Sequence, residues 1–300
     1  MSKIVVIGSS NTDMVVQSER LPRPGESVLG GDFMMAGGGK GANQAVAVAR
    51  MGHKVVFSAA LGNDIFGDAA LNSYQNFGID TTHIVRKDIP SGVALIMVDS
   101  KGQNCISVAL GANNALSIED VLPALDSVES GDIVLLQLEI PMATVEAAVE
   151  AAAAKGARVV LNPAPAAPVS EQVLSNLYLI TPNQTEAQTL TGVEVTDEAS
   201  ACEAAQILCA RGVERVVITM GGSGAYLYEN GKGVIVPARM VDAIDTTAAG
   251  DVYNGALCAA LAEGKSLEQA LAFATKASAI SVTRAGAQPS VPSREEVDNF

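Results

Sequence analysis

Short runs rich in Val, Ile and Leu alternate with longer Ala-rich runs along most of the 300-residue chain. The short runs predict strands at residues 3–7, 55–60, 132–138, 158–161, 177–180 and 215–220. Helical spacing of apolar residues predicts helices at 41–50, 66–77, 142–155, 198–211, 249–263 and 267–283. Strands that alternate with helices form βαβ units. We therefore expect an α/β fold with a doubly wound, mostly parallel sheet flanked by helices.

Two segments interrupt this alternation. Residues 91–113 read as a hairpin with a polar turn and no following helix, and residues 14–36 read as strand and turn with several Pro and Gly. We expect one domain over 1–300, with a small β lid formed by about 14–36 and 91–113. The lid's apolar residues need cover from substrate or a second subunit, which predicts a homodimer. A plain extension of the main sheet is the alternative.

Composition excludes several classes of function. The net charge is −14 without a basic cluster, so neither nucleic acid nor an anionic membrane is an expected partner. The four cysteines and two histidines lack metal-ligand spacing, so we expect no zinc site. The N-terminus reads directly as a strand without a signal peptide, and no apolar run is long enough to span a membrane. These features predict a cytoplasmic protein.

The segment from Asp245 to Gly255 reads Asp-Thr-Thr-Ala-Ala-Gly-Asp-Val-Tyr-Asn-Gly and leads into the helix predicted at 249–263. The first N–H groups of a helix lack internal partners and carry partial positive charge, so they can bind an anion. Asp251 places a carboxylate there, where it could accept the proton of a hydroxyl that attacks a phosphate. The alternative is that Asp251 only stabilises the helix start.

Polar or glycine-rich clusters follow several predicted strands: Asn11 and Asp13, Glu139, Asn183 and Glu186, and 219–224. The carboxyl ends of parallel strands meet at one edge of a sheet, so these clusters predict a cleft, although each alone could be a turn. The Gly-Gly-Gly-Lys-Gly-Ala-Asn stretch at 37–43 opens a helix. It lacks P-loop spacing, because Met34 stands where a glycine is needed, and it fits a dinucleotide fingerprint only loosely.

Together these motifs resemble the PfkB, or ribokinase, family of carbohydrate kinases over residues 4–292. The resemblance is carried by Gly-Gly-Lys-Gly-Ala-Asn-Gln, by Asp-Thr-Thr-Ala-Ala-Gly-Asp, by the Asn-x-x-Glu motif at Asn183 and Glu186, and by the tail 281–290. It implies a ribokinase-like fold and ATP-dependent phosphorylation of a sugar's primary hydroxyl.

The resemblance also implies residue roles. Asp251 is the general base, and the backbone N–H groups of Ala248, Ala249 and Gly250 form the anion hole. The sugar is held by Asn11, Thr12, Asp13, Gly39, Lys40, Gly41, Ala42, Asn43 and Glu139. ATP is contacted by Asn183, Thr219, Met220, Gly221, Gly222, Ser223, Gly224, Gly250, Asp251 and Thr275. Glu186 helps to organise Mg²⁺, and a monovalent cation such as K⁺ is bound around Asp245, Thr247, Ser281, Arg284, Gly286 and Ser290.

Two departures from the family pattern surround the expected base. The family often has Gly-Ala-Gly-Asp where this chain has Ala-Ala-Gly-Asp at 248–251. If the first position needs a positive φ, Ala248 strains the turn. Val252 and Tyr253 replace the more usual Thr-Phe, and nothing in the sequence explains that change.

The polar pair Asn11 and Asp13 favours a sugar with adjacent hydroxyls, because a site that hydrogen-bonds a hydroxyl rejects the analogue lacking it. With the resemblance, this predicts phosphorylation of D-ribose at its 5-hydroxyl. A 2-deoxyribose or nucleoside kinase of the same family is the alternative. A non-catalytic sugar-binding sensor would explain the pocket without Asp251, and a dinucleotide-dependent oxidoreductase is a third class.

Overall fold

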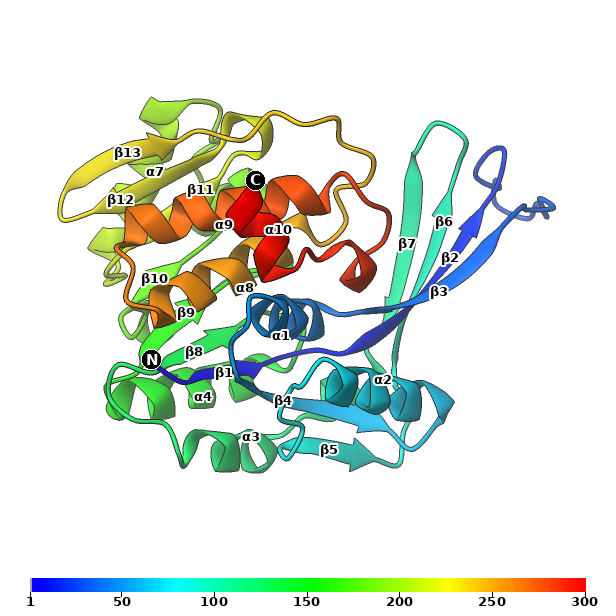
Figure 1. Ribbon diagram of the computed structural model, residues 1–300, viewed down its shortest axis with the longest axis horizontal. Helices are drawn as coiled ribbons and strands as arrows, with labels where there is room; N and C mark the ends of the chain where they lie inside the picture. The colour runs from blue at the N-terminus through cyan, green and yellow to red at the C-terminus, as the bar shows by residue number, and fades with distance from the viewer. Residues whose placement is uncertain (1) are drawn as a thin grey trace.

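The computed structural model describes residues 2–300 as a nine-stranded sheet with helices on both faces and a separate four-stranded sheet (Figure 1). The large sheet has the order β13-β12-β11-β10-β9-β8-β1-β4-β5. Neighbours from β11 to β5 are parallel, and β12 pairs antiparallel with both β11 and β13. Its strands are β1 (Ile4–Ile7), β4 (Val55–Gly62), β5 (Ile84–Lys87), β8 (Ile133–Leu136), β9 (Arg158–Leu161), β10 (Leu179–Ile180), β11 (Val216–Thr219), β12 (Ala225–Glu229) and β13 (Lys232–Val236).

Successive residues of the central strands point into two hydrophobic cores, as strand geometry requires. Ile4 and Val6 of β1 belong to one core, and Val5 and Ile7 belong to the other. The first core contains α1 (Lys40–Arg50), α8 (Ala249–Ala262) and α9 (Leu267–Ser281), with α2 (Ile65–Asn76) and α10 (Arg294–Asn299) beside it. The second contains α3 (Ile118–Leu125), α4 (Met142–Ala154), α5 (Glu171–Leu174), α6 (Gln184–Thr191) and α7 (Glu198–Ala210). The expected doubly wound α/β architecture is confirmed.

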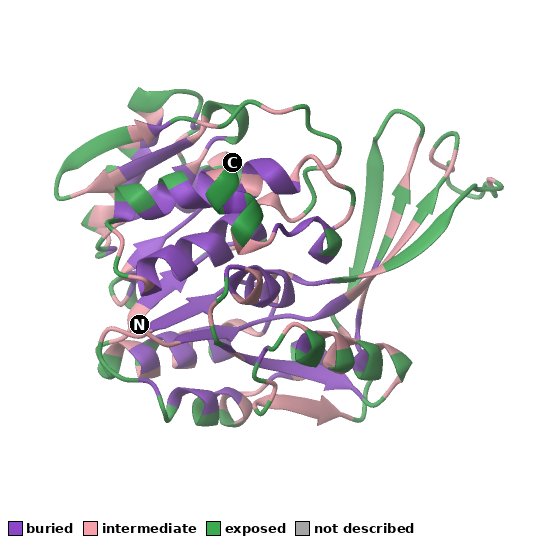
Figure 2. Ribbon diagram, viewed as in Figure 1, coloured by how far each residue is buried: buried purple, intermediate pink, exposed green. Residues whose placement is uncertain are grey.

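The four-stranded sheet, called the lid sheet below, projects beyond one edge of the large sheet (Figure 1). Its order is β3-β2-β6-β7, with β2 (Asn11–Gln17), β3 (Phe33–Gly38), β6 (Gly92–Val98) and β7 (Asn104–Ala109). Figure 2 shows that much of this sheet is exposed, in contrast to the buried centre of the large sheet. Several of its apolar side chains are uncovered, including Phe33 at 58% and Leu95 at 55% exposure.

Three short 3₁₀ segments complete the described elements: η1 (Gly111–Ala115), η2 (Gly221–Ser223) and η3 (Gln288–Ser290). The first follows the lid sheet and packs against β4, and the third packs against β3 and α1. Within residues 2–300, none of the helices has both the length and the apolar character needed to cross a bilayer.

Candidate active site

The predicted polar clusters converge because they follow parallel strands. Ser9 and Asn11 lie just beyond β1, Glu139 lies beyond β8, and Asn183 lies beyond β10. The glycine-rich turn η2 directly follows β11. The N-termini of α1 and α8 approach the same edge, so this edge combines carboxylates, amides and helix starts.

Asp251 lies at the third position of α8 and is buried between that helix and α1. Asn43 Nδ2 donates to its Oδ2 at 2.9 Å, and Gln44 Nε2 donates to its Oδ1 at 2.9 Å. Burial raises the pKa of Asp251 overall, although the charge of Lys40 and these two hydrogen bonds lower it in part. The carboxylate therefore does more than stabilise the helix start, because its partners lie on another helix.

The partners of Asp251 continue into a buried amide network. Gln44 Nε2 also donates to Asn162 Oδ1 at 3.0 Å, and Gln44 Oε1 accepts from Gln137 Nε2 at 2.6 Å. Asn162 Nδ2 in turn donates to the carbonyl of Thr181 at 3.2 Å. Since each amide is oriented by its neighbour, the network fixes the position of the Asp251 carboxylate.

Lys40 places one ammonium group among several carboxylates. Burial lowers the pKa of Lys40, but the charges of Asp251, Glu139, Glu186 and Asp13 outweigh burial and raise it overall. The lysine is therefore charged at neutral pH, and its charge partly offsets the negative charge that these carboxylates bring to the site.

Glu139 joins the end of β8 to the start of α1. Its Oε2 accepts from Ser9 Oγ at 2.6 Å and from the backbone N–H of Lys40 at 3.0 Å. Gly39, which precedes α1, has φ +87°, and a Cβ there would lie 2.7 Å from the backbone nitrogen of Asn11. The glycine therefore serves close packing between these segments, in addition to any approach to a ligand.

Asp13 lies on β2 opposite Ala36, and its carboxylate lies over Gly38, where an added Cβ would be 2.3 Å from the carboxylate oxygens. Burial, and then the charges of Glu139 and Asp251, raise the pKa of Asp13 to about 6, against a smaller lowering by Lys40. Thr12, Gly41 and Ala42, which are also expected at the sugar site, lie beside these residues on β2 and α1.

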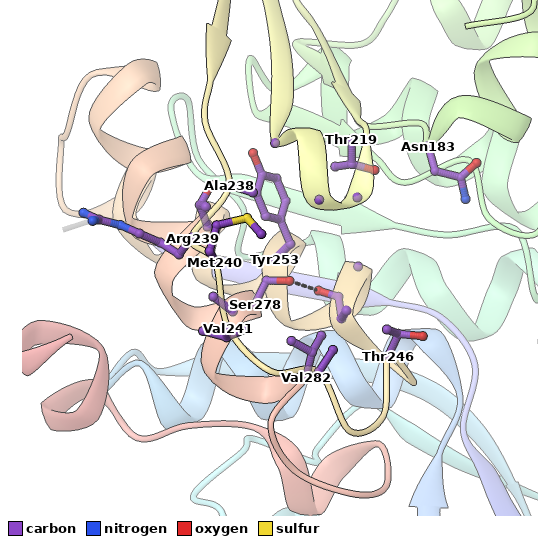
Figure 3. A pocket seen from close by; sticks show the side chains of 18 of the residues that line it. Asn183, Thr219, Ala238, Arg239, Met240, Val241, Thr246, Tyr253, Ser278 and Val282 are labelled. Atoms are coloured by element: carbon purple, nitrogen blue, oxygen red, sulfur yellow. Dashed lines mark hydrogen bonds between the residues drawn. The ribbon is translucent and has the colours of Figure 1, made fainter. Parts of the chain in front are cut away.

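A cleft of about 480 Å³ opens beside the N-terminus of α8. Figure 3 shows its walls: α8 and α9 on one side, the loop that carries Ala238 and Met240, and the strand ends at Asn183 and Thr219. Ser278 Oγ donates to the Ala249 carbonyl at 3.0 Å and joins the two helices there.

Most residues expected to contact ATP line this cleft: Asn183, Thr219, Gly221, Gly222, Gly224, Gly250 and Thr275. Three expected contacts do not line it: Met220 is part of the second hydrophobic core, Ser223 lies outside the cleft wall, and Asp251 is buried against α1. Tyr253, for which the sequence offered no explanation, lines the cleft. The hydroxyls of Thr275 and Tyr253 are both buried, and neither forms a hydrogen bond within residues 2–300.

Asn183 and Glu186 form a capping box at the start of α6. Asn183 Oδ1 accepts from the Glu186 N–H at 2.8 Å, and Glu186 Oε2 accepts from the Asn183 N–H at 2.8 Å. Burial raises the pKa of Glu186, partly offset by the hydrogen bond from Asn183 and by Lys40. The motif thus has a structural role, and Glu186 retains a second carboxylate oxygen for other contacts.

Ala248 adopts the left-handed conformation with φ +59°, immediately before α8. A non-glycine residue there costs about 1–3 kcal/mol and is retained when the surrounding structure requires it. The Ala249 N–H donates to the Thr246 carbonyl at 3.2 Å, whereas the Gly250 N–H has no partner within residues 2–300. Gly250 lines the cleft, so its N–H is available to a ligand.

The predicted cation residues are partly brought together. Asp245 Oδ1 accepts from the Thr247 N–H at 2.9 Å, and Asp245 Oδ2 accepts from the Gly286 N–H at 2.8 Å. Burial raises the pKa of Asp245, but these hydrogen bonds lower it overall. The Ser281 and Ser290 hydroxyls donate to nearby carbonyls, of Ser278 at 2.8 Å and of Ala287 at 2.7 Å. The Arg284 side chain forms an ion pair with Glu296 at the surface. Only the backbone carbonyl of Arg284 could therefore act as a ligand of the predicted cation.

Several buried residues that shape the site were not predicted from the sequence: Ser9, Gln44, Asn113, Gln137 and Asn162. Gln44 had a local signal, since it directly follows the glycine-rich motif on α1. The others come from separate segments and are polar residues at or beyond strand ends, where a search for buried amides could have found them.

A family model described as pfkB family carbohydrate kinase matches residues 1–294. The chain belongs to the PfkB family of carbohydrate kinases. Its sequence is 46% identical over 299 residues to a ribokinase of Haemophilus influenzae, across 99% of this chain and 97% of that relative. The family resemblance inferred from the motifs is therefore confirmed.

Solved structures agree with this membership in the PfkB family. A ribokinase of Thermotoga maritima is 40% identical with a TM-score of 0.91, and the match covers 100% of this chain and 99% of that one. An Arabidopsis thaliana ribokinase complexed with ribose and ATP is 32% identical with a TM-score of 0.90, over 99% and 98% of the two chains. The separate lid sheet is thus part of a shared fold.

Proposed function

We propose that the chain transfers the γ-phosphoryl group of ATP to the 5-hydroxyl of D-ribose, giving D-ribose 5-phosphate and ADP. One observation carries this proposal: the buried Asp251 carboxylate directly follows Gly250, which lines the cleft and whose N–H has no partner within residues 2–300. A proton acceptor therefore adjoins an anion-binding helix start. Similarity to ribokinases over nearly the whole chain supports ribose and ATP as the substrates.

In this mechanism Asp251 accepts the proton of the attacking hydroxyl. Asn43 and Gln44 hold its two oxygens, so the carboxylate enters the reaction already oriented. The Lys40 ammonium and the start of α8, where the Gly250 N–H has no partner within residues 2–300, stabilise negative charge that develops during transfer. Asn11, Asp13 and Glu139 would hold the sugar, while the cleft around Thr219 and Thr275 would hold ATP.

Mg²⁺ and K⁺ complete the proposed site. The free oxygen of Glu186 suits Mg²⁺, which prefers oxygen ligands and usually keeps water and substrate phosphates in its coordination shell. No group of three or more His, Cys, Asp or Glu within 2–300 could hold a metal by itself. When bound, Mg²⁺ would neutralise phosphate charge.

For K⁺, the ionised Asp245 and the backbone carbonyls near Ser281, Arg284 and Gly286, with Thr247 and Ser290, offer oxygen ligands beside the N-terminus of α8. Asp245 is fixed by two backbone N–H groups, so the loop that carries it is ordered beside the anion hole. A cation bound there would add positive field near the transferred phosphoryl group without touching the sugar.

The lid sheet would close over the sugar and exclude water, which would otherwise hydrolyse ATP. Its exposed apolar side chains, such as Phe33, Met35, Leu95 and Ile106, support a homodimer formed through this sheet. Solution mass provides the test: a stable dimer of the 30.7 kDa chain supports this assembly, and a monomer at all micromolar concentrations contradicts it.

Coupled ADP release with Mg-ATP and D-ribose, with and without K⁺, tests the proposed reaction. Ribose-dependent turnover that rises with K⁺ supports the base, the anion hole and the cation site together. Ribose-dependent turnover that does not change with K⁺ supports the kinase activity but contradicts the proposed cation site. If ribose is inert, a panel of 2-deoxyribose, fructose and adenosine tests the other kinase activities. Failure with every substrate favours a sugar-binding sensor.

A further inference from the structure

Asn113 lies in η1, just beyond the lid strand β7, and is completely buried beside Asn11. Its Oδ1 accepts from the Ser10 N–H at 2.8 Å. Its Nδ2 donates to the Ser10 carbonyl at 3.1 Å and to Asn11 Oδ1 at 2.8 Å. A Cβ at Gly92 would lie 2.2 Å from Asn11 Oδ1 and 2.3 Å from Asn113 Nδ2, so the two amides fit only beside a glycine.

The backbone of Ser10 determines which way both amides face. A backbone N–H can only donate, so the Asn113 atom that faces it must be the carbonyl oxygen. Asn113 Nδ2 therefore faces Asn11, and the Asn11 atom in that contact must be Oδ1. This leaves Asn11 Nδ2 as the free end of the side chain. It donates to no residue within 2–300.

Asn11 and Asp13 are two residues apart on β2, so their side chains lie on the same face of the lid sheet. When ionised, Asp13 can only accept hydrogen bonds, whereas the free Asn11 Nδ2 can only donate. A hydroxyl has one hydrogen to donate and lone pairs with which to accept. A hydroxyl that gives its hydrogen to Asp13 has only lone pairs left, and these match Asn11 Nδ2.

We propose that Asn113 is a positioning residue for substrate selectivity: it locks Asn11 as an N–H donor, so that one ring hydroxyl of the sugar bridges Asp13 and Asn11. This inference rests on the proposed sugar kinase activity and adds to it. An analogue without the bridging hydroxyl leaves both Asn11 and Asp13 unpaired, and the site rejects it. Asn113 touches no substrate itself; it acts through Asn11.

The isosteric change Asn113→Asp tests this proposal. The new carboxylate can only accept, so Asn11 must rotate its amide to donate to it and must present Oδ1 to the sugar. The bridging hydroxyl then meets two acceptors with one hydrogen. We expect KM for D-ribose to rise about tenfold, corresponding to one lost hydrogen bond in a buried site, with kcat changed less than about threefold.

The monodeoxy analogues 2-deoxy-D-ribose and 3-deoxy-D-ribose separate selectivity from general damage. The analogue that lacks the bridging hydroxyl forms no hydrogen bond that the substitution could remove. Its kcat/KM should therefore change less than about threefold in Asn113→Asp. The ratio of kcat/KM for D-ribose to that for this analogue should therefore fall about tenfold. An equal change for D-ribose and both analogues would mean that Asn113 only supports the fold, and would overturn the proposal.

Asn11→Asp keeps the experiment decisive if Asn113→Asp does not fold. In that variant Asn113 Nδ2 still has an acceptor, and an oxygen replaces the outward N–H directly. Its kcat/KM for D-ribose should fall about tenfold relative to that for the analogue that lacks the bridging hydroxyl. A selectivity ratio unchanged from the wild type contradicts the proposal. If the wild-type protein phosphorylates no sugar, the proposed function fails; if only the selectivity stays unchanged, this inference alone fails.

Discussion

The two halves of the candidate site are built differently. On the sugar side, Asp251, Gln44 and Asn162 are buried and joined by hydrogen bonds of 2.9–3.0 Å. On the nucleotide side, the cleft is lined largely by glycines and small residues, and by an exposed loop in which Met240 is 86% exposed. A buried, hydrogen-bonded network is oriented before substrate arrives. We therefore expect residues on the sugar side to determine kcat, and residues on the nucleotide side mainly to determine the affinity for ATP.

The largest expected effect belongs to Asp251→Asn. The amide cannot accept the hydroxyl proton, so kcat should fall roughly 10²–10⁴-fold, the usual contribution of a general base. Binding of ribose and ATP should be retained, as calorimetric titration would verify. A kcat near the wild-type value would remove Asp251 from the mechanism.

Gln44→Met should have the next largest effect, because it removes one of the two side-chain donors to Asp251 at similar volume. We expect kcat to fall roughly tenfold, with a loss of about 1–3 kcal/mol in the free energy of unfolding as buried polar partners are left unpaired. Gln137→Met, one step further along the network, provides the matched control and should have a smaller effect on kcat. Equal effects would show that the network does not act through the base.

Asp13 predicts how the sugar side responds to pH. Its pKa is raised to about 6, chiefly by burial, so it is an ionised acceptor above that pH and is protonated below it. The value of kcat/KM for ribose should fall as pH drops through about 6, approaching tenfold per pH unit. A profile measured from pH 5 to 8 that stays flat would contradict this assignment.

The same raised pKa affects stability with the opposite sign. Between the unfolded pKa of about 4 and the folded pKa of about 6, the folded protein holds a proton that the unfolded chain has released. The contribution of Asp13 to stability therefore declines as pH rises through that window. Urea unfolding of the wild type and Asp13→Asn across it should show the variant losing less stability as pH rises.

The smallest expected effects come from replacing one threonine by valine on each side of the site, Thr181 on the sugar side and Thr275 on the nucleotide side. Thr181 Oγ1 donates to Asn254 Oδ1 at 2.6 Å in the buried network, whereas Thr275 Oγ1 forms no hydrogen bond within 2–300. Thr181→Val should cost about 1–3 kcal/mol in the free energy of unfolding, and Thr275→Val less than about 0.5 kcal/mol. Thr275→Val should raise KM for ATP a few-fold at most. Equal losses of stability in the two variants would contradict the claim that only the sugar side depends on a buried hydrogen-bond network.

The fold could be predicted where periodicity was strong. The helix expected at 249–263 is Ala249–Ala262, and the strand expected at 158–161 is Arg158–Leu161. The helix α3 was missed because Pro123 lies inside it. The hairpin formed by β12 and β13 was missed although Asn230 and Gly231, both with positive φ, give a clear turn signal.

The candidate site was predictable only in part, because its partners meet through tertiary structure. Motif spacing indicated Asp251 and the anion site at a helix start, yet Gln44 is 207 residues away from Asp251 and Gln137 is 93 residues away from Gln44. Local patterns carry no information about such pairs. Ala248 has a positive φ, which is the condition under which alanine in place of the family's glycine strains this turn.

Identification of the product is the strongest test of whether the protein phosphorylates D-ribose at its 5-hydroxyl. The protein would be incubated with Mg-ATP, K⁺ and D-ribose, and the sugar phosphate would be assigned by phosphorus and carbon NMR while ADP is measured in parallel. We expect ADP and D-ribose 5-phosphate in equal amounts, with phosphorus attached at C5 only. ADP formed at the same rate without sugar, or phosphorylation at another position, would contradict it.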